Sequence, residues 1–133
     1  MEGKMKLSEA VRVGAMLRPQ GVGAYFTKRY FVSPENNFGE WECTRSCALG
    51  AAYEATFGQT DVTVDPGQDG AMRKAYPVLN RRIGVVDLHL WITNLNDREG
   101  WTRTQIADYV AIIEDYAEQM DNAPFSQSAA LAA

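Results

Sequence analysis

The sequence has few of the residues from which metal sites and disulfide frameworks are built. It contains two cysteines, Cys43 and Cys47, and one histidine, His89, among 133 residues. A structural zinc site needs four ligands, usually from paired cysteines and histidines, so these three side chains cannot complete one. Two cysteines cannot form a framework of several disulfides either. We therefore expect neither a metal nor another cofactor, and a fold held together by its hydrophobic core.

Long apolar runs are also missing. No stretch approaches the roughly 20 apolar residues that a membrane-spanning helix requires. The first thirty residues, where a secretory signal would lie, are interrupted by Lys4, Lys6, Arg12 and Arg18. These absences predict a cytoplasmic protein that has no membrane partner.

Basic residues are outnumbered by acidic ones. Thirteen lysines and arginines stand against seventeen aspartates and glutamates, which gives a net charge of −4. Proteins that bind nucleic acids neutralise phosphates with clustered lysine and arginine, so this balance argues against a nucleic-acid partner. The local cluster of Arg73, Lys74, Arg81 and Arg82 keeps weak nucleic-acid binding as a second alternative function.

The charge is divided unevenly between the two ends of the chain. Residues 1–30 carry six basic and two acidic residues, a net charge of +4. Residues 103–133 carry one basic and five acidic residues, a net charge of −4. Opposite charges of equal size predict that the ends attract each other, within one chain or between copies.

The composition is that of one ordinary domain, with 46% hydrophobic and 23% charged residues. We expect a single globular domain over residues 1–122 and a flexible C-terminal tail over residues 123–133. The expected fold is mostly α and formally α+β: a compact helical domain with a small β hairpin or strand pair near residues 22–32. Aromatic and β-branched residues, which favour strands, are concentrated in that segment.

Helix signals are strongest over residues 101–121. Thr102 and Gln105 have the spacing of a capping box, in which each side chain accepts a hydrogen bond from the other residue's backbone amide. Apolar residues then recur at helical spacing: Ile106, Val110, Ile113, Ala117 and Met120. An amphipathic helix that buries this stripe is therefore expected.

Further helices are predicted from periodicity and from residues that start or stop helices. One covers residues 8–17 with Ser8 as its cap, and one runs from Trp41 or Cys43 to Phe57. The second is rich in alanine and glycine, so we expect another backbone to pack closely against it. Residues 59–70 are expected to form an acidic loop with a short strand at 62–64, and residues 71–80 a helix interrupted near Pro77. Residues 83–95 fit a strand or a helix, and we favour the helix.

The order of segments resembles one known family. A Gly-Ala-Tyr segment at 23–25 precedes Ser-Cys-Ala-Leu-Gly-Ala at 46–51, and Leu-Asn-Asp at 95–97 precedes the Thr-capped helix. This pattern, over roughly residues 20–118, resembles a family of small uncharacterised bacterial and phage-encoded proteins, a domain of unknown function built around a Cys-Ala-Leu-Gly-Ala helix. Ser46 stands where that family often has tryptophan. The resemblance implies a mostly helical domain with a small β element and no catalytic residues.

Cys47 and His89 are the residues that could carry catalysis. His89 could activate the Cys47 thiol, with Asp87 or Asp97 orienting the imidazole ring. A reactive cysteine needs a lowered pKa and exposure, whereas Cys47 lies in an apolar stretch that would raise its pKa. A thiol-dependent enzyme is therefore the first alternative function. If residues 43–57 are helical, Cys43 and Cys47 also lie on one face of the helix.

A cluster of aromatic residues suggests the leading function. Residues 25–41 contain more large aromatic side chains than a small core easily covers, and such side chains dominate protein interfaces. The expected interaction residues are all aromatic: Tyr25, Phe26, Tyr30, Phe31, Phe38 and Trp41. No complete catalytic set is visible elsewhere. We therefore expect a non-enzymatic accessory protein, bacterial or phage-encoded, that binds a protein partner or assembles into a homo-oligomer.

Overall fold

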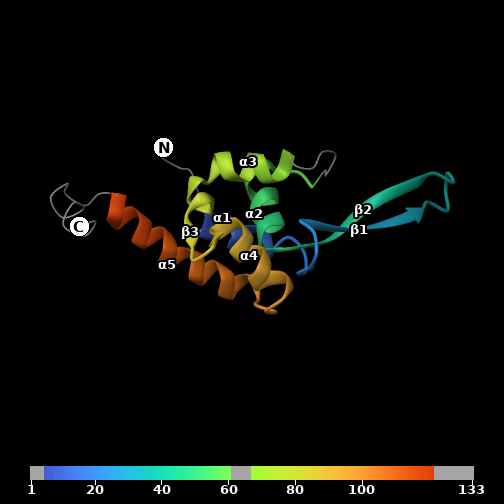
Figure 1. Cartoon of the computed structure of the whole chain (residues 1–133). Coiled ribbons are helices and arrows are strands. Elements are labelled where there is room, and N and C mark those ends of the chain that lie inside the picture. Colours follow the sequence, from blue (N-terminus) through green and yellow to red (C-terminus); the bar gives the residue numbers. More distant parts are fainter. Residues whose placement is uncertain (1–4, 61–66, 122–133) are drawn as a thin grey trace.

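The computed structural model describes residues 5–60 and 67–121 and shows a mostly α fold with two small antiparallel strand pairs (Figure 1). This confirms the expected α+β class with a small β element, and one strand of the longer pair lies within the expected residues 22–32. The expected tail and the expected strand at 62–64 lie outside the described residues. The elements are α1 (Leu7–Ala15), β1 (Phe26–Val32), β2 (Gly39–Ser46), α2 (Ala48–Phe57), α3 (Gly67–Ala75), the 3-10 turn η1 (Pro77–Asn80), β3 (Arg82–Ile83), β4 (Val86–Asp87), α4 (Leu88–Asp97) and α5 (Arg103–Asp121).

The small residues of α2 allow two backbones to approach it, as the sequence predicts. A Cβ atom on Gly14 of α1 would lie 1.8 Å from the carbonyl oxygen of Ala51. A Cβ atom on Gly50 would lie 2.0 Å from the carbonyl oxygen of Tyr25. Both glycines are therefore required by close packing. Gly14 lets α1 pack against α2, and Gly50 lets the segment before β1 pack against α2.

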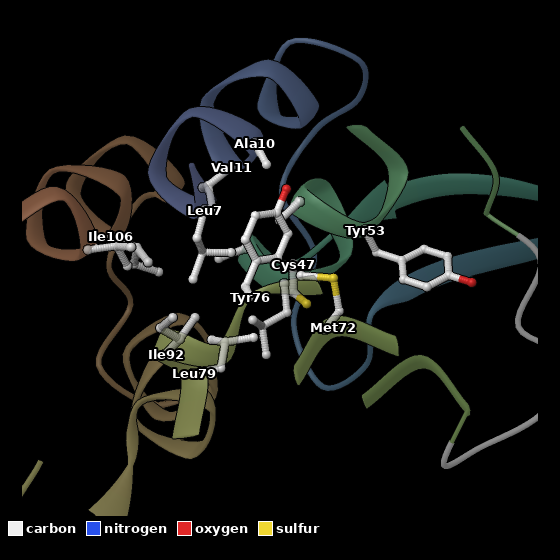
Figure 2. Packing of buried hydrophobic residues seen from close by; sticks show 14 of the residues in the cluster. Leu7, Ala10, Val11, Cys47, Tyr53, Met72, Tyr76, Leu79, Ile92 and Ile106 are labelled. Atoms are coloured by element: carbon white, nitrogen blue, oxygen red, sulfur yellow. The ribbon is translucent and has the colours of Figure 1, made fainter. Parts of the chain in front are cut away.

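One hydrophobic core lies between the helices. Figure 2 shows the side chains of Leu7, Leu79, Ile92 and Ile106 converging from four different elements. Each of these four side chains is completely buried. Helix α5 contributes most of the predicted stripe: Ile106, Val110 and Ala117 are buried, and Ile113 and Met120 are half-buried. Burying apolar area of this kind is the main source of stability in a domain of this size.

The opposite charges of the two ends meet within one chain. Arg12 of α1 donates to Asp108 of α5 at 2.7 Å, and Lys6 lies 3.6 Å from Glu118. These pairs are largely exposed to solvent and contribute little stability each. They nevertheless join the basic N-terminal region to the acidic helix α5, which is the attraction that the charge pattern predicts.

Strands β1 and β2 form a hairpin that extends away from the helices (Figure 1). The pairing runs from Phe26 opposite Ser46 at the base to Val32 opposite Gly39 near the tip. The predicted loop at 34–39 is therefore the turn of this hairpin, apart from Gly39, which already belongs to β2. We call residues 26–46 the arm.

The predicted helix from Trp41 or Cys43 is wrong over residues 41–46. These residues form β2, and the helix begins at Ala48 with Cys47 as its N-cap. The Cys47 thiol accepts a hydrogen bond from the Gly50 amide at 3.3 Å, which is the role of a capping side chain. Cys43 and Cys47 consequently do not share a helix face.

Three other boundaries differ from the predictions. Helix α1 is capped at Lys6, where Glu9 accepts from the Lys6 amide, and Ser8 lies buried inside the helix. Helix α3 begins at Gly67, within the expected loop. Residues 82–87 form the small β3–β4 hairpin, so the favoured helix of 83–95 begins only at Leu88. At α1 and α4 a local cap, which periodicity does not detect, marks where the helix starts.

The capping box of α5 is confirmed. The Thr102 amide donates to Gln105 Oε1 at 2.9 Å, and the Gln105 amide donates to Thr102 Oγ1 at 3.1 Å. Pro77 interrupts the preceding helix as predicted, because it opens the separate turn η1. Among the residues that the structure describes, none of the helices combines the length and the apolar character needed to cross a bilayer.

The contact between α1 and α2 yields a stability prediction. We expect Gly14→Ala to lower the free energy of unfolding by about 2 kcal/mol or more, because the new methyl group meets the Ala51 backbone, which cannot move aside alone. Urea unfolding followed by circular dichroism measures this change. Gly70→Ala is the matched control: nothing lies within 4 Å of its Cβ position, and alanine favours helix, so it should raise stability by up to about 1 kcal/mol. Equal effects of both substitutions would contradict the close-packing argument.

Candidate functional site

The outer part of the arm carries an aromatic pair on one face. Tyr30 and Trp41 are directly opposite each other in the pairing, so their side chains share a face. Their ring centroids are 5.2 Å apart in an edge-to-face arrangement. Both rings are open to solvent, with exposed fractions of 53% and 67%. Such a pair stiffens the hairpin and presents a large apolar surface at the same time.

Neighbouring residues extend this apolar face. Val32, two residues after Tyr30, is exposed on the same side of the strand. A side chain on Gly39 would collide with the Tyr30 ring, so that ring lies over the glycine backbone. The opposite face carries the Arg29–Glu42 ion pair at 2.6 Å. The arm is therefore apolar on one face and more polar on the other.

The six aromatic residues expected to be exposed do not share one environment. Tyr30, Phe31, Phe38 and Trp41 are exposed on the arm. Phe26 is only 5% exposed, and the expectation of an exposed ring is wrong there, because the base of β1 packs on Tyr53 of α2. Tyr25 is half-buried and lines a cavity in the helical body.

The cavity lies between the segment before β1, the start of α2, the start of α3 and helix α4. Its volume is about 300 Å³, which is the lower end of the range for small-molecule sites. It holds both residues of the predicted thiol–imidazole pair. The described lining consists of Gly23, Ala24, Tyr25, Cys47, Leu49, Gln68, Asp69, His89, Leu90, Ile92, Thr93, Asn96 and Asp97.

His89 is held by partners other than the expected ones. Its Nε2 atom lies 2.9 Å from the Tyr25 hydroxyl and 3.2 Å from Asp69 Oδ1. The residue is 4% exposed, and burial lowers the pKa of His89 despite the opposing effect of Asp69. The imidazole is therefore neutral at pH 7. Burial also raises the pKa of Tyr25, so its hydroxyl keeps its proton.

Asp87 does not orient the His89 ring. Its carboxylate accepts from Arg73 at 2.7 Å and from the Leu90 amide at 3.0 Å, which makes it the N-cap of α4. Arg73 lowers the pKa of Asp87, so this carboxylate stays ionised. The carboxylate beside His89 is Asp69, which the sequence reasoning assigned to an acidic loop.

The Cys47 thiol is not arranged as a nucleophile. Burial raises the pKa of Cys47 to about 11. Among the hydrogen bonds of the described residues, the thiol accepts from the Gly50 amide, and none joins it to His89. Cys47 and His89 thus line the same cavity without forming a catalytic pair. The described residues also contain no group of three or more His, Cys, Asp or Glu that could hold a metal ion.

Two buried polar residues that the sequence reasoning missed position this region. Asn96 accepts from Gln20 Nε2 at 2.8 Å and from the Ala48 amide at 3.1 Å, and donates to the Gly21 carbonyl at 2.9 Å. The available signal was an asparagine one turn after Ile92, on the apolar face of its helix. A buried amide at such a place needs several partners, which marks it as a structural junction.

Arg103 forms the second junction, at the start of α5. It is 8% exposed and donates to Ser46 Oγ at 2.9 Å and to the Arg18 carbonyl at 2.7 Å. These bonds connect α5 to the end of β2 and to the chain that follows α1. The guanidinium has several donors in a fixed plane, which suits it to joining several carbonyl groups.

The predicted basic cluster is partly neutralised. Arg73 pairs with Asp87, and Arg81 pairs with Asp121. Arg82 donates to the Val85 carbonyl. The arginines are thus used within the fold, and the geometry gives a nucleic-acid interface little support.

Comparisons of the chain with protein-family models, with curated proteins and with solved structures found no match. The resemblance to the family built around a Cys-Ala-Leu-Gly-Ala helix therefore remains a prediction.

The burial of Cys47 predicts slow reaction with thiol reagents. A pKa of about 11 instead of 9 leaves about a hundredfold less thiolate at neutral pH. In a Cys43→Ser variant, we expect alkylation by iodoacetamide at pH 7.5 to be at least a hundredfold slower in the folded chain than in denaturant. Cys43 in a Cys47→Ser variant, which is half-buried on the arm, should react faster. Rapid labelling of Cys47 would instead support the thiol-dependent enzyme.

The Asn96 junction predicts a large loss of stability on truncation. Asn96→Ala leaves the Ala48 amide and the Gly21 carbonyl without their partner, so we expect the free energy of unfolding to fall by about 3 kcal/mol. Chemical denaturation measures the change. Asn94→Ala, on the same helix, is the control and should cost much less, because the Asn94 side chain makes no hydrogen bond to another described residue. A small effect at Asn96 would show that the junction is not needed.

Proposed function

We propose that the protein is a non-enzymatic interaction module that self-associates through the apolar face of the arm. The observation that carries this proposal is the exposed Tyr30–Trp41 pair on a hairpin that extends from the helical body (Figure 1). The role of an accessory protein of bacterial or phage origin rests on the resemblance described above.

The uncovered apolar side chains and free strand edges of the arm favour a binding partner. A two-stranded hairpin is marginally stable in water unless its apolar face is covered. The base of the arm is covered, since Phe26 and Ser46 are buried, but Tyr30, Val32 and Trp41 are not. An exposed apolar surface on a projecting hairpin is typical of an interface. The arm pairs only with itself beyond its base among the described residues, so both of its strands also have a free edge.

The charge of the arm favours a second copy as the partner. Residues 27–45 contain three basic residues, Lys28, Arg29 and Arg45, and three acidic ones, Glu35, Glu40 and Glu42. The net charge of this segment is therefore zero, whereas the whole chain carries −4. Arg29, Glu40 and Glu42 lie on the face opposite Tyr30 and Trp41. In a two-fold symmetric contact the same surface meets itself, and these charges do not oppose a contact through the apolar face.

The alternatives receive less support. Cys47 and His89 line one cavity, but the raised pKa of the thiol and the bonds of His89 to Tyr25 and Asp69 do not favour a thiol-dependent enzyme. Weak nucleic-acid binding would need the arginines that pair with Asp87 and Asp121.

The mass of the protein in solution tests the proposal. We expect sedimentation equilibrium to give twice the 14.8 kDa mass of the chain, with a dissociation constant that a Tyr30→Ser/Trp41→Ser variant raises about thirtyfold or more. Such a loss, about 2 kcal/mol, is typical of central aromatic residues in an interface. Circular dichroism of the variant verifies that the helical body is intact.

A matched variant distinguishes this interface from non-specific association through other exposed apolar residues. Val85→Ser/Ile112→Ser removes two exposed apolar side chains outside the arm, and we expect it to associate as the unmodified chain does. A chain that stays monomeric at all concentrations would overturn the proposal. Association that survives the loss of Tyr30 and Trp41 would overturn it as well.

A further inference from the structure

The cavity of the helical body contains an unusual pair of atoms. Within the described residues, two buried side-chain polar atoms have no hydrogen-bond partner: Nδ1 of His89 and Nε2 of Gln68. Both residues are 4% exposed, and both line the same cavity. A buried polar atom without a partner costs about 1–3 kcal/mol. Two such atoms in the wall of one cavity indicate a place where a bound molecule would supply the partners.

The hydrogen-bonding character of these atoms follows from their surroundings. His89 Nε2 lies near the Tyr25 hydroxyl and the Asp69 carboxylate, and the carboxylate accepts hydrogen bonds but cannot donate one. The Tyr25 hydroxyl is itself hydrogen-bonded to Asp69, so its proton is directed to the carboxylate and not to Nε2. Nε2 therefore carries the proton of the neutral ring, and Nδ1 is an acceptor. The Gln68 amide nitrogen is a donor. A molecule that satisfies both must offer a donor and an acceptor within one cavity of about 300 Å³.

The charge of the cavity restricts the molecule further. Two carboxylates, Asp69 and Asp97, belong to the described lining, and no lysine or arginine does. Arg73 acts on His89 electrostatically from nearby, but it is paired with Asp87 at 2.7 Å. An anion would be repelled by this arrangement, and a cation would be attracted. Leu49 and Leu90 make part of the cavity wall apolar, which suits an uncharged, apolar part of the bound molecule.

We infer that this cavity binds a small organic cation of the amino alcohol or amino carbonyl class. In this arrangement the ammonium group donates to His89 Nδ1, and the negative charges of Asp69 and Asp97 in the cavity lining attract it. The neighbouring hydroxyl or carbonyl oxygen accepts from Gln68 Nε2, and the apolar body lies against Leu49 and Leu90. This inference does not depend on the proposed self-association, because the cavity and the apolar face of the arm share no residue.

Three probes with the same apolar body test the charge requirement. Phenylalaninol carries the ammonium and the hydroxyl group, 3-phenylpropan-1-ol keeps the hydroxyl alone, and 3-phenylpropanoate carries a negative charge. We expect saturable shifts of the Gly23, Leu49 and Asn96 amide resonances and of the His89 ring nitrogens with phenylalaninol. Binding of the neutral alcohol should be at least tenfold weaker, and the anion should not bind. Equal binding of all three, or no binding of phenylalaninol, would overturn the inference.

Matched substitutions test the named residues. Asp97→Asn should weaken phenylalaninol binding at least fivefold, whereas Asp115→Asn, the same change on the exposed surface of α5, should leave it unchanged. Gln68→Met should also weaken binding while leaving the free protein as stable as before or more so, because it removes an amide nitrogen without a partner. Binding that is unaffected by both Asp97→Asn and Gln68→Met would place the probe elsewhere. The Tyr30→Ser/Trp41→Ser variant should bind the probe normally, so failure here and failure of self-association are separate results.

Discussion

The positions of the arm and of the cavity both depend on the hydrogen bonds of two buried side chains, Asn96 and Arg103. Asn96 holds the Gln20–Gly21 segment and the first amide of α2 against the end of α4. Arg103 holds Ser46 and the carbonyl of Arg18, in the segment that follows α1, against the start of α5. Helix α1 ends near this junction, the arm begins and ends near it, and α2 starts there. If either side chain lost its partners, buried carbonyl and amide groups would be left unsatisfied at the point where these elements meet.

Adjacent residues connect the two candidate functional regions. The Tyr25 carbonyl accepts from the Cys47 amide at 3.0 Å and lies against Gly50, while the Tyr25 hydroxyl reaches His89 in the cavity. Phe26, the next residue, begins the arm and packs on Tyr53. The base of the arm and one wall of the cavity are thus the same stretch of chain. The glycine at position 50 is required there because any side chain would displace Tyr25.

Sequence reasoning succeeded where the physical signal is local or periodic. The capping box of Thr102 and Gln105, the buried stripe of α5 and the break at Pro77 each depend on residues within a few positions of one another. It failed at residues 41–46, because they pair with β1, a segment elsewhere in the chain. It also failed at Asp69, because the contact of this residue with His89 joins α3 to α4. Tertiary contacts decided these cases, and no short window of sequence contains them.

The amino-acid sequence by itself determined the mostly helical class, the attraction between the basic residues 1–30 and the acidic residues 103–133, and the shortage of metal ligands. These properties follow from composition, from periodicity and from the sign of charges, which do not depend on the fold. Only the tertiary structure decided that Cys47 is a buried helix cap, that Phe26 is core while Trp41 is surface, and that His89 meets Asp69 and Tyr25. Burial and partnership are properties of a residue's neighbours in space, and those neighbours come from elements far apart in the chain.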